Sequence, residues 1–335
     1  MTVEIAVVGA GGMAEEHLSN LADHPDAETV AVVATSEESA RETADQFERE
    51  DGPAIAAYAD PAACYDAEKP DAEEPDAAVV SVPPFAHPEP ELAAAERDVH
   101  LFVEKPLATS RATAREVAEA VADSGLVTQV GHMYRYADIV ERAADLLEDR
   151  QIALVEGRWI DGVAPLDWWP EKAKSGGQVV EQAVHIYDLV RYLAGDVAEI
   201  EAHGDQRVVT DEIDFPDSSS ATMHHESGAV SHVAASSAAP TRDVGVEVVA
   251  EECRLELDFD ANRLTGVVDG EEITFEGGDA GYAAELDAFV DAVADADPSA
   301  PRSPYADARR TFEVTMDVRD RIAGESAASG DHSAE

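Results

Sequence analysis

The sequence predicts a two-domain α/β protein: a parallel sheet covered by helices on both faces, then an α+β domain with a large, mainly antiparallel, open sheet. Two observations predict this fold class. Over the first 130 residues, short apolar segments alternate with longer helical ones, which is typical of a parallel sheet. From about residue 197 to 276, strand-like segments follow one another with Gly and Asp turns between them, as in antiparallel sheets.

In the first domain (1–130) we expect five strands, with a helix after each of the first four. The strands are 4–9, 29–35, 77–82, 99–105 and 126–131, and the helices are 13–24, 36–50, 88–98 and 110–125. Ser110 is the expected N-cap of the fourth helix, because its hydroxyl can accept a hydrogen bond from the first turn.

The second domain (131–324) begins with a helix and a strand, followed by a loop rich in Pro, Trp and Gly. A helix, a run of strands and two closing helices come next. The expected helices are 137–150, 179–195, 280–296 and 303–324, and the strands are 153–162, 199–204, 219–226, 229–237, 244–251, 253–260, 263–270 and 271–277. We expect the tail, 325–335, to be disordered.

The formal net charge is −49, from 72 acidic and 23 basic residues. Such a charge repels nucleic acid and anionic membranes, so neither is an expected partner. The regular apolar segments argue against a disordered acidic protein, and a carboxylate-covered surface fits the salt-rich cytoplasm of a halophile. The chain begins with a strand and has no membrane-length apolar run, so we expect a cytoplasmic protein.

A glycine-rich turn links the first strand to the first helix. Its spacing is Gly9-x-Gly11-x-x-Ala14, with Gly12 and Met13 inside it. Gly9 permits the tight turn, Gly11 lets a pyrophosphate approach the backbone, and Ala14 allows close packing of helix on strand. The turn therefore predicts dinucleotide binding at a helix N-terminus. The alternatives are an ordinary tight turn or a nucleoside-cofactor fold such as a methyltransferase.

The end of the second strand carries the cofactor preference. An acidic residue there favours NAD, but this strand ends in Thr35 and Ser36, with Arg41 one helical turn further on. Small hydroxyl residues leave room for a 2′-phosphate, so the sequence favours NADP over NAD. The alternative is that Thr35 and Ser36 only cap the following helix.

The tripeptide Glu-Lys-Pro occurs twice. Lys69 lies in an acidic, proline-rich segment and is expected to be a solvated linker residue. Lys105 ends an apolar strand, and the carboxyl ends of parallel strands face the ligand crevice. A lysine beside apolar walls there can exchange protons, so Lys105 is the catalytic candidate. The alternative is a structural pair between Lys105 and Glu104.

The segment 176–193 places Glu181 and His185 four residues apart, on one face of a single expected helix, with Asp188 one turn further. A carboxylate can orient an imidazole and tune its protonation. A second interpretation is that Glu181 and His185 form half of a metal site. The chain offers no further ligand cluster, so we expect no metal. The third interpretation is that His185 has a purely structural role.

The order of these elements resembles the Gfo/Idh/MocA oxidoreductases, the glucose–fructose oxidoreductase and inositol dehydrogenase family, over about residues 5–324. The resemblance implies a Rossmann domain, an α/β domain whose sheet mediates oligomers, and hydride transfer between a nicotinamide and a sugar or polyol carbon. It implies that Lys105 polarises the reacting hydroxyl and that His185 exchanges its proton. Glu181 stands where the family usually has Asp, so its role is open.

The resemblance also covers the segment from Pro83 and His87 to Glu104, which we assign to cofactor binding. The expected substrate contacts are Tyr134, Arg135, Trp168 and Trp169. The alternative for the two tryptophans is a rigid surface loop with one buried ring.

The sequence thus predicts an NAD(P)-dependent oxidoreductase of sugars or polyols that forms a homodimer or homotetramer. A glycosidase-like enzyme that uses its cofactor transiently and a non-catalytic dinucleotide-binding sensor are the alternatives.

Overall fold

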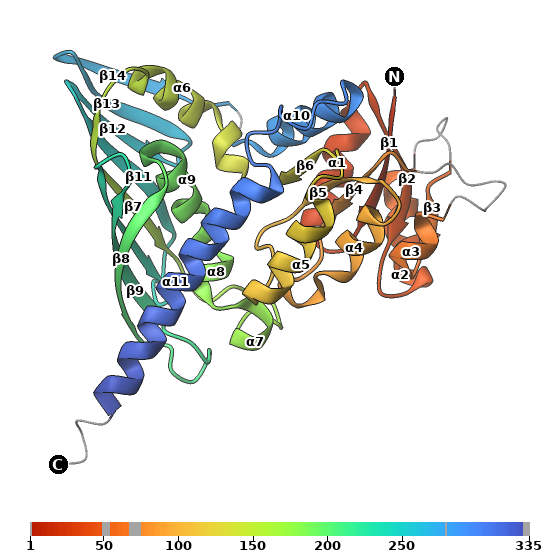
Figure 1. The fold of residues 1–335 in the computed structure, drawn as a ribbon, viewed down its shortest axis with the longest axis horizontal. Helices are drawn as coiled ribbons and strands as arrows, with labels where there is room; N and C mark the ends of the chain where they lie inside the picture. The colour runs from red at the N-terminus through yellow and green to blue at the C-terminus, as the bar shows by residue number, and fades with distance from the viewer. Residues whose placement is uncertain (1, 49–53, 67–74, 279, 331–335) are drawn as a thin grey trace. The chain divides into compact units, whose positions relative to one another are not determined.

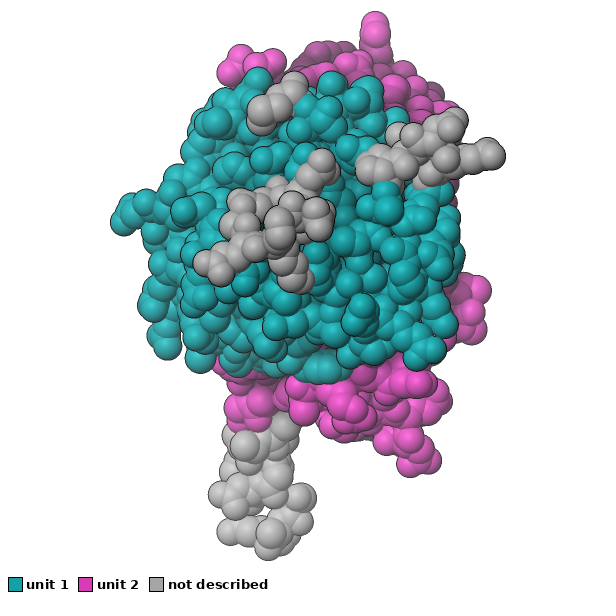
Figure 2. Space-filling model, turned by 90° about the vertical axis from the view of Figure 1, so that its right-hand side faces the viewer, with its two compact units in different colours: residues 1–132, 282–309 teal, residues 133–281, 310–335 magenta. Residues whose placement is uncertain are grey.

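The computed structural model describes residues 2–48, 54–66, 75–278 and 280–330. The chain divides into two compact units, coloured separately in Figure 2. Unit 1 comprises residues 1–132 and 282–309, and unit 2 comprises 133–281 and 310–335. The second domain was expected to be continuous from residue 131, but the chain returns to unit 1 before it ends. The first Glu-Lys-Pro copy, with Lys69, lies outside the described residues.

Unit 1 contains a six-stranded, all-parallel sheet with the strand order β3-β2-β1-β4-β5-β6, which is the Rossmann order. Its strands are β1 (Val3–Val8), β2 (Ala27–Val33), β3 (Ala56–Tyr58), β4 (Ala77–Val80), β5 (His100–Val103) and β6 (Thr128–Val130). Its helices are α1 (Gly12–Asp23), α2 (Glu37–Phe47), α3 (Pro61–Cys64), η1 (Pro84–Ala86), α4 (Glu89–Ala95), α5 (Arg111–Val121) and α10 (Tyr282–Ala294). The short β3 and α3 were not predicted, because neither carries a recognisable apolar pattern.

The central strands of this sheet end in register. Val8 of β1 pairs with Val80 of β4, which pairs with Val103 of β5. The ladder continues for one more residue, since the N–H of Ser81 donates to Val8 O and the N–H of Glu104 donates to Val80 O, at 2.7 and 2.8 Å. The glycine turn and the second Glu-Lys-Pro segment therefore leave the sheet at the same edge.

The returning helix α10 completes the core of unit 1. Leu286, Phe289 and Val290 are fully buried and belong to the same apolar cluster as the strand residues Val7 and Phe102. The Phe289 ring meets Phe102 edge to face, with the ring centroids 5.7 Å apart. Such aromatic pairs add to the stabilisation from apolar burial.

Unit 2 contains an eight-stranded sheet with the order β14-β13-β12-β11-β7-β10-β9-β8, antiparallel except for the β7–β10 pair. Its strands are β7 (Ile152–Ile160), β8 (Val197–Asp205), β9 (Ser218–His225), β10 (Val230–Ser236), β11 (Asp243–Ala250), β12 (Cys253–Asp258), β13 (Arg263–Val268) and β14 (Glu271–Glu276). Its helices are η2 (Met133–Tyr136), α6 (Asp138–Leu147), α7 (Lys172–Ser175), α8 (Gln178–Glu181) and α9 (Val184–Ala194). Helix α9 lies against β7 and β10 (Figure 1).

The last helix, α11 (Tyr305–Gly330), passes from unit 1 to unit 2 between residues 309 and 310. It ends at Gly330, further along the chain than the expected residue 324. None of the helices within the described residues has the length and hydropathy needed to cross a membrane. The predicted combination of a parallel sheet and a larger, mainly antiparallel one is confirmed.

Candidate active site

The glycine turn in unit 1 has the geometry that its spacing predicts. Gly9 has φ +135°, and a Cβ there would lie 2.5 Å from the carbonyl oxygen of Ser81, so only glycine fits. At Gly11 and Gly12, a Cβ would meet no atom within 4 Å, which leaves the backbone open to a ligand. Ala14 is fully buried under the sheet. These residues fit a dinucleotide pyrophosphate, held at the start of α1.

Glu104 has a structural partner inside unit 1. Its side chain is 8% exposed, and its Oε1 lies 2.8 Å from Nε2 of His17, a fully buried residue of α1. Its Oε2 accepts a hydrogen bond from the backbone N–H of Lys105, at 3.2 Å. The carboxylate therefore ties the turn that carries Lys105 to the helix that follows the glycine turn. This arrangement differs from the expected direct contact with the cofactor, and His17 was not predicted.

The remaining cofactor candidates, Pro83 and His87, flank one short helix, and His87 has a buried carboxylate partner. Pro83 precedes the short helix η1, and His87 follows it. The Nδ1 of His87 is bonded to Oε1 of Glu91, and both side chains are almost completely buried. A carboxylate partner orients an imidazole ring, so Glu91 positions His87 within this turn.

Two of the three residues that favoured NADP, Ser36 and Arg41, have other partners. The Ser36 hydroxyl caps α2 by accepting from the N–H of Ser39, at 3.1 Å, which is the alternative considered above. Arg41 bonds to the Asp45 and Glu48 carboxylates and donates to the carbonyl of Ile55, at 2.7 Å. The hydrogen bond to Glu48 is the largest cause that raises the pKa of Arg41. Thr35 adds no cation, so the charge available for a 2′-phosphate is already matched.

His185 of unit 2 lies among aromatic rings. The Trp159 indole stacks on it with a centroid distance of 5.5 Å and an interplanar angle of 17°. Tyr134 lies 5.5 Å from it, tilted by 57°, and itself stacks on Phe259 at 3.9 Å. The guanidinium of Arg242 lies 4.6 Å from the centre of the Trp159 ring. These contacts leave His185 only 6% exposed and hold its ring in one orientation.

Trp159 and Arg242 were missed by the sequence analysis. They come from β7 and from the start of β11, so no short motif links them to His185. Burial is the largest single influence and acts to lower the pKa of Arg242, but the hydrogen bond to Asp260 and the nearby charges of Tyr134, Asp260 and Asp161 together outweigh it, and the pKa lies above its ordinary value. A permanent cation therefore stacks on the ring that supports His185.

The helix that was expected to carry both Glu181 and His185 is interrupted, so that prediction was wrong. Helix α8 ends at Glu181 and α9 begins at Val184. The N–H of Ala183 donates to the carbonyl of Gln178, five residues back, at 2.9 Å. Such an i→i−5 bond widens the helical path, so Glu181 and His185 do not share the face of one regular helix.

Glu181 is bonded to the loop that precedes it. The Trp169 indole N–H donates to its Oε2 at 2.6 Å, and Trp169 is fully buried against Phe215 and Ile213. Trp169 is therefore a buried ring, as in the rigid-loop alternative. Trp168 is half-buried at the edge of the same cluster.

Arg135, one of the expected substrate contacts, is held in a buried ion pair. Its Nε and Nη2 donate to the two carboxylate oxygens of Asp188, at 2.7 and 2.6 Å, and both side chains are 2% exposed. The hydroxyl of Thr311 in α11 donates to the same carboxylate at 2.8 Å. The pair ties η2, α9 and α11 together beneath Tyr134 and His185.

The loop between β8 and β9 is organised by Asp217. Its Oδ2 accepts from the N–H groups of Arg207, Val208 and Val209, at 2.8, 2.5 and 3.1 Å. Burial acts to raise the pKa of Asp217, but these three donors and the Ser218 hydroxyl together outweigh burial and lower it. The same loop carries Phe215, which packs on Trp169.

We expect Asp217→Asn to lower the free energy of unfolding by about 1–2 kcal/mol near neutral pH, because the hydrogen bonds lose their charge. A lowered folded-state pKa stabilises above the unfolded value of about 3.9 and is lost as pH falls through the folded value. The difference between variant and parent should therefore shrink below about pH 4. Denaturant unfolding at several pH values measures it, and a constant difference would contradict the assignment.

Within the described parts of the chain, no three or more His, Cys, Asp or Glu side chains are grouped so that they could hold a metal ion. His224 and His225 are adjacent in β9, and His225 is bonded to Gly195 and Ser231.

Comparison with known families gives two matches along the chain. Residues 3–132 match a model described as an oxidoreductase family with an NAD-binding Rossmann fold. Residues 151–256 match the GFO/IDH/MocA C-terminal domain.

Two curated relatives illustrate the range of similarity. The scyllo-inositol 2-dehydrogenase (NAD(+)) of Bacillus subtilis is 30% identical over 188 residues, which are 53% of each chain. The D-xylose 1-dehydrogenase (NADP(+)) 2 of Haloferax volcanii is 27% identical over 257 residues, 71% of this chain and 76% of that protein. The first three curated relatives are matched over 37%, 53% and 35% of their own length.

Solved structures share the fold over nearly the whole chain. A levoglucosan dehydrogenase in complex with NADH and L-sorbose superposes with a TM-score of 0.85 at 20% identity, covering 97% of this chain and 98% of that one.

Proposed function

The chain belongs to the Gfo/Idh/MocA oxidoreductase family, and on that premise we propose that it transfers hydride between a nicotinamide cofactor and a hydroxyl-bearing carbon of a sugar or polyol. The observation that carries this proposal is the shared edge of the parallel sheet. Gly9, Ser81 and Glu104 follow three paired strands in register, and Lys105 comes next. The salt adaptation of the protein, its cytoplasmic location and its assembly into a homodimer or homotetramer stay predictions.

We assign separate roles to the two candidate catalytic residues. A bound nicotinamide supplies the carbon that accepts or gives the hydride. The Lys105 ammonium stabilises the negative charge that develops on the substrate oxygen. His185 takes the hydroxyl proton during oxidation and returns it during reduction. Trp159 and Tyr134 hold the imidazole for this exchange, and Glu181, bonded to Trp169, orders the preceding loop.

The proposal is tested by cofactor binding followed by turnover. The protein is titrated with NADH and NADPH in concentrated KCl, with nicotinamide fluorescence as the signal. It is then assayed with levoglucosan, scyllo-inositol and D-xylose, the compounds in the names of its relatives, and with further aldoses and polyols. Binding with net change of cofactor redox state is expected. Sugar cleavage without it would indicate the glycosidase-like alternative, and binding without any turnover would indicate the sensor.

We further propose that the site accepts NADH at least as well as NADPH, because Arg41 is matched by Asp45 and Glu48. In Arg41→Ala, the ratio of the two dissociation constants should change by less than about threefold, the effect of one exposed charge pair. The titration above measures this ratio. A selective loss of NADPH affinity of about tenfold or more would instead make Arg41 a phosphate ligand.

A further inference from the structure

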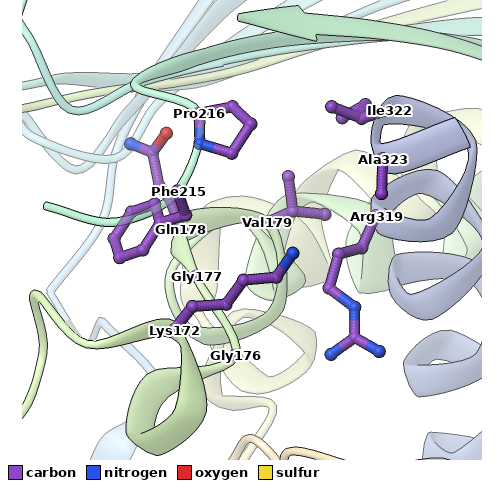
Figure 3. A pocket seen from close by; sticks show the side chains of 10 residues that line it. All are labelled: Lys172, Gly176, Gly177, Gln178, Val179, Phe215, Pro216, Arg319, Ile322 and Ala323. Atoms are coloured by element: carbon purple, nitrogen blue, oxygen red, sulfur yellow. The ribbon is translucent and has the colours of Figure 1, made fainter. Parts of the chain in front are cut away.

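Unit 2 contains a partly open cavity of about 260 Å³ between α7, α8, the Phe215–Pro216 loop and α11 (Figure 3). Its apolar wall includes Phe215, Pro216 and Ile322, and its polar lining includes Lys172, Gln178 and Arg319. The volume lies just below the range of common small-molecule sites, roughly 300–1,000 Å³. The size and the mixed lining fit a small amphipathic compound.

Lys172 is unusual among the few cations of this chain. The protein has 72 acidic residues, yet within the described residues no carboxylate lies within 4 Å of the Lys172 ammonium. Lys174, two residues further along α7, instead pairs with Glu171 at 2.7 Å. Figure 3 shows the Lys172 side chain extended along the cavity, while Arg319 reaches down from α11. In so acidic a protein, an unmatched cation at a cavity indicates that a ligand supplies the counter-charge.

Gln178 gives a second, independent indication of a ligand. Its side chain lines the cavity and the residue is only 2% exposed. Its amide Nε2 has no hydrogen-bond partner among the described residues. A buried donor without a partner is unfavourable, and an acceptor atom in the cavity would satisfy it.

We propose that this cavity binds a small organic anion, with a carboxylate or phosphate group at Lys172 and an apolar body against Phe215 and Ile322. Arg319 also lines the cavity and brings a second positive charge to it. Cationic donors match the acceptor oxygens of either group. The amide of Gln178 lies beside Phe215 and Pro216, away from the Lys172 ammonium (Figure 3), so it is the donor for a polar atom at the other end of the ligand.

The wall of the cavity leads towards the candidate catalytic segment. Phe215 meets Trp169 edge to face, with centroids 5.1 Å apart, and the Trp169 indole holds Glu181. A compound that presses on Phe215 is therefore two side chains from Glu181. Through these contacts, binding of an effector in the cavity would act on the loop that precedes His185.

The test uses probes that differ in charge at constant shape. Benzoate, phenyl phosphate and benzyl alcohol are titrated calorimetrically into the full-length protein in concentrated KCl. At least one anion should bind, about tenfold or more tightly than benzyl alcohol, because a hydrogen-bonded charge is worth that much. The tighter anion identifies carboxylate or phosphate as the preferred group.

Two matched variants locate the site. Lys172→Met should weaken binding of the anion about tenfold or more, whereas Lys174→Met removes a neighbouring charge outside the cavity and should leave it unchanged. NADH titration of both variants confirms that they are folded and reports separately on the proposed cofactor turn. Failure of both anions to bind, equal binding of benzyl alcohol, or full binding in Lys172→Met would overturn the proposal.

Discussion

Lys105→Met should lower turnover by about two to four orders of magnitude, the range found when a positioned proton donor or an oxyanion donor is removed. Methionine keeps an apolar stem of similar length but cannot donate to the substrate oxygen. Affinity for NADH should stay unchanged, because the glycine turn does not depend on this side chain. Single-turnover rates with the best compound from the sugar screen, together with NADH titration, measure both quantities.

The chain supplies its own control for this experiment. Lys69 stands in the same Glu-Lys-Pro tripeptide, so Lys69→Met makes the same change of charge in the same local sequence and should keep full turnover. Lys105→Arg retains the charge but presents it as a planar fork and should recover only part of the rate. If Lys105→Met turned over at the parental rate, its assignment as a catalytic residue would be lost.

Arg135→Met should lower the free energy of unfolding by about 3–5 kcal/mol, because it leaves the Asp188 carboxylate buried without its cation. The double variant Arg135→Met/Asp188→Leu should recover most of that loss, since apolar side chains of similar volume often replace a buried pair without cost. Denaturant unfolding in KCl measures the free energy of unfolding of the parent protein, the single variant and the double variant.

This experiment also separates the two roles considered for Arg135. If it bound substrate directly, Arg135→Met would raise KM with little change in unfolding. The buried bidentate geometry predicts the opposite order of effects. A stable Arg135→Met protein with a raised KM would restore the sequence-based interpretation.

The parts of the site that depend on local backbone geometry could be predicted from the sequence. Gly9 must be glycine because of its positive φ and the nearby Ser81 carbonyl. Its spacing from Gly11 and Ala14 is the sequence pattern that indicates this turn. The choice of Lys105 over Lys69 depends on a signal of the same kind, since only Lys105 follows an apolar strand, and it stays a prediction. In both cases the signal lies within a few residues of the chain.

The parts that depend on tertiary contacts could not be predicted. Trp159 reaches His185 from a strand 26 residues earlier in the numbering, and His17 reaches Glu104 from a helix far away in the sequence. Trp169 and Arg135 are of residue types that often bind ligands, but each is bonded to a buried carboxylate, Glu181 and Asp188 respectively. These partners draw both side chains into the protein interior. The interruption between α8 and α9 has no glycine or proline inside it to indicate where the helix ends.

The return of residues 282–309 to unit 1 has a consequence for how the protein is made. A ribosome releases the chain from its N-terminus, and domains generally fold as they emerge. The parallel sheet emerges first, but the apolar surface that includes Phe102 is covered only after Phe289 on α10 has been synthesised. The whole eight-stranded sheet is synthesised in that interval. The nascent first half must therefore persist with part of its core uncovered, which makes it the stage of biosynthesis most exposed to aggregation and to chaperone binding.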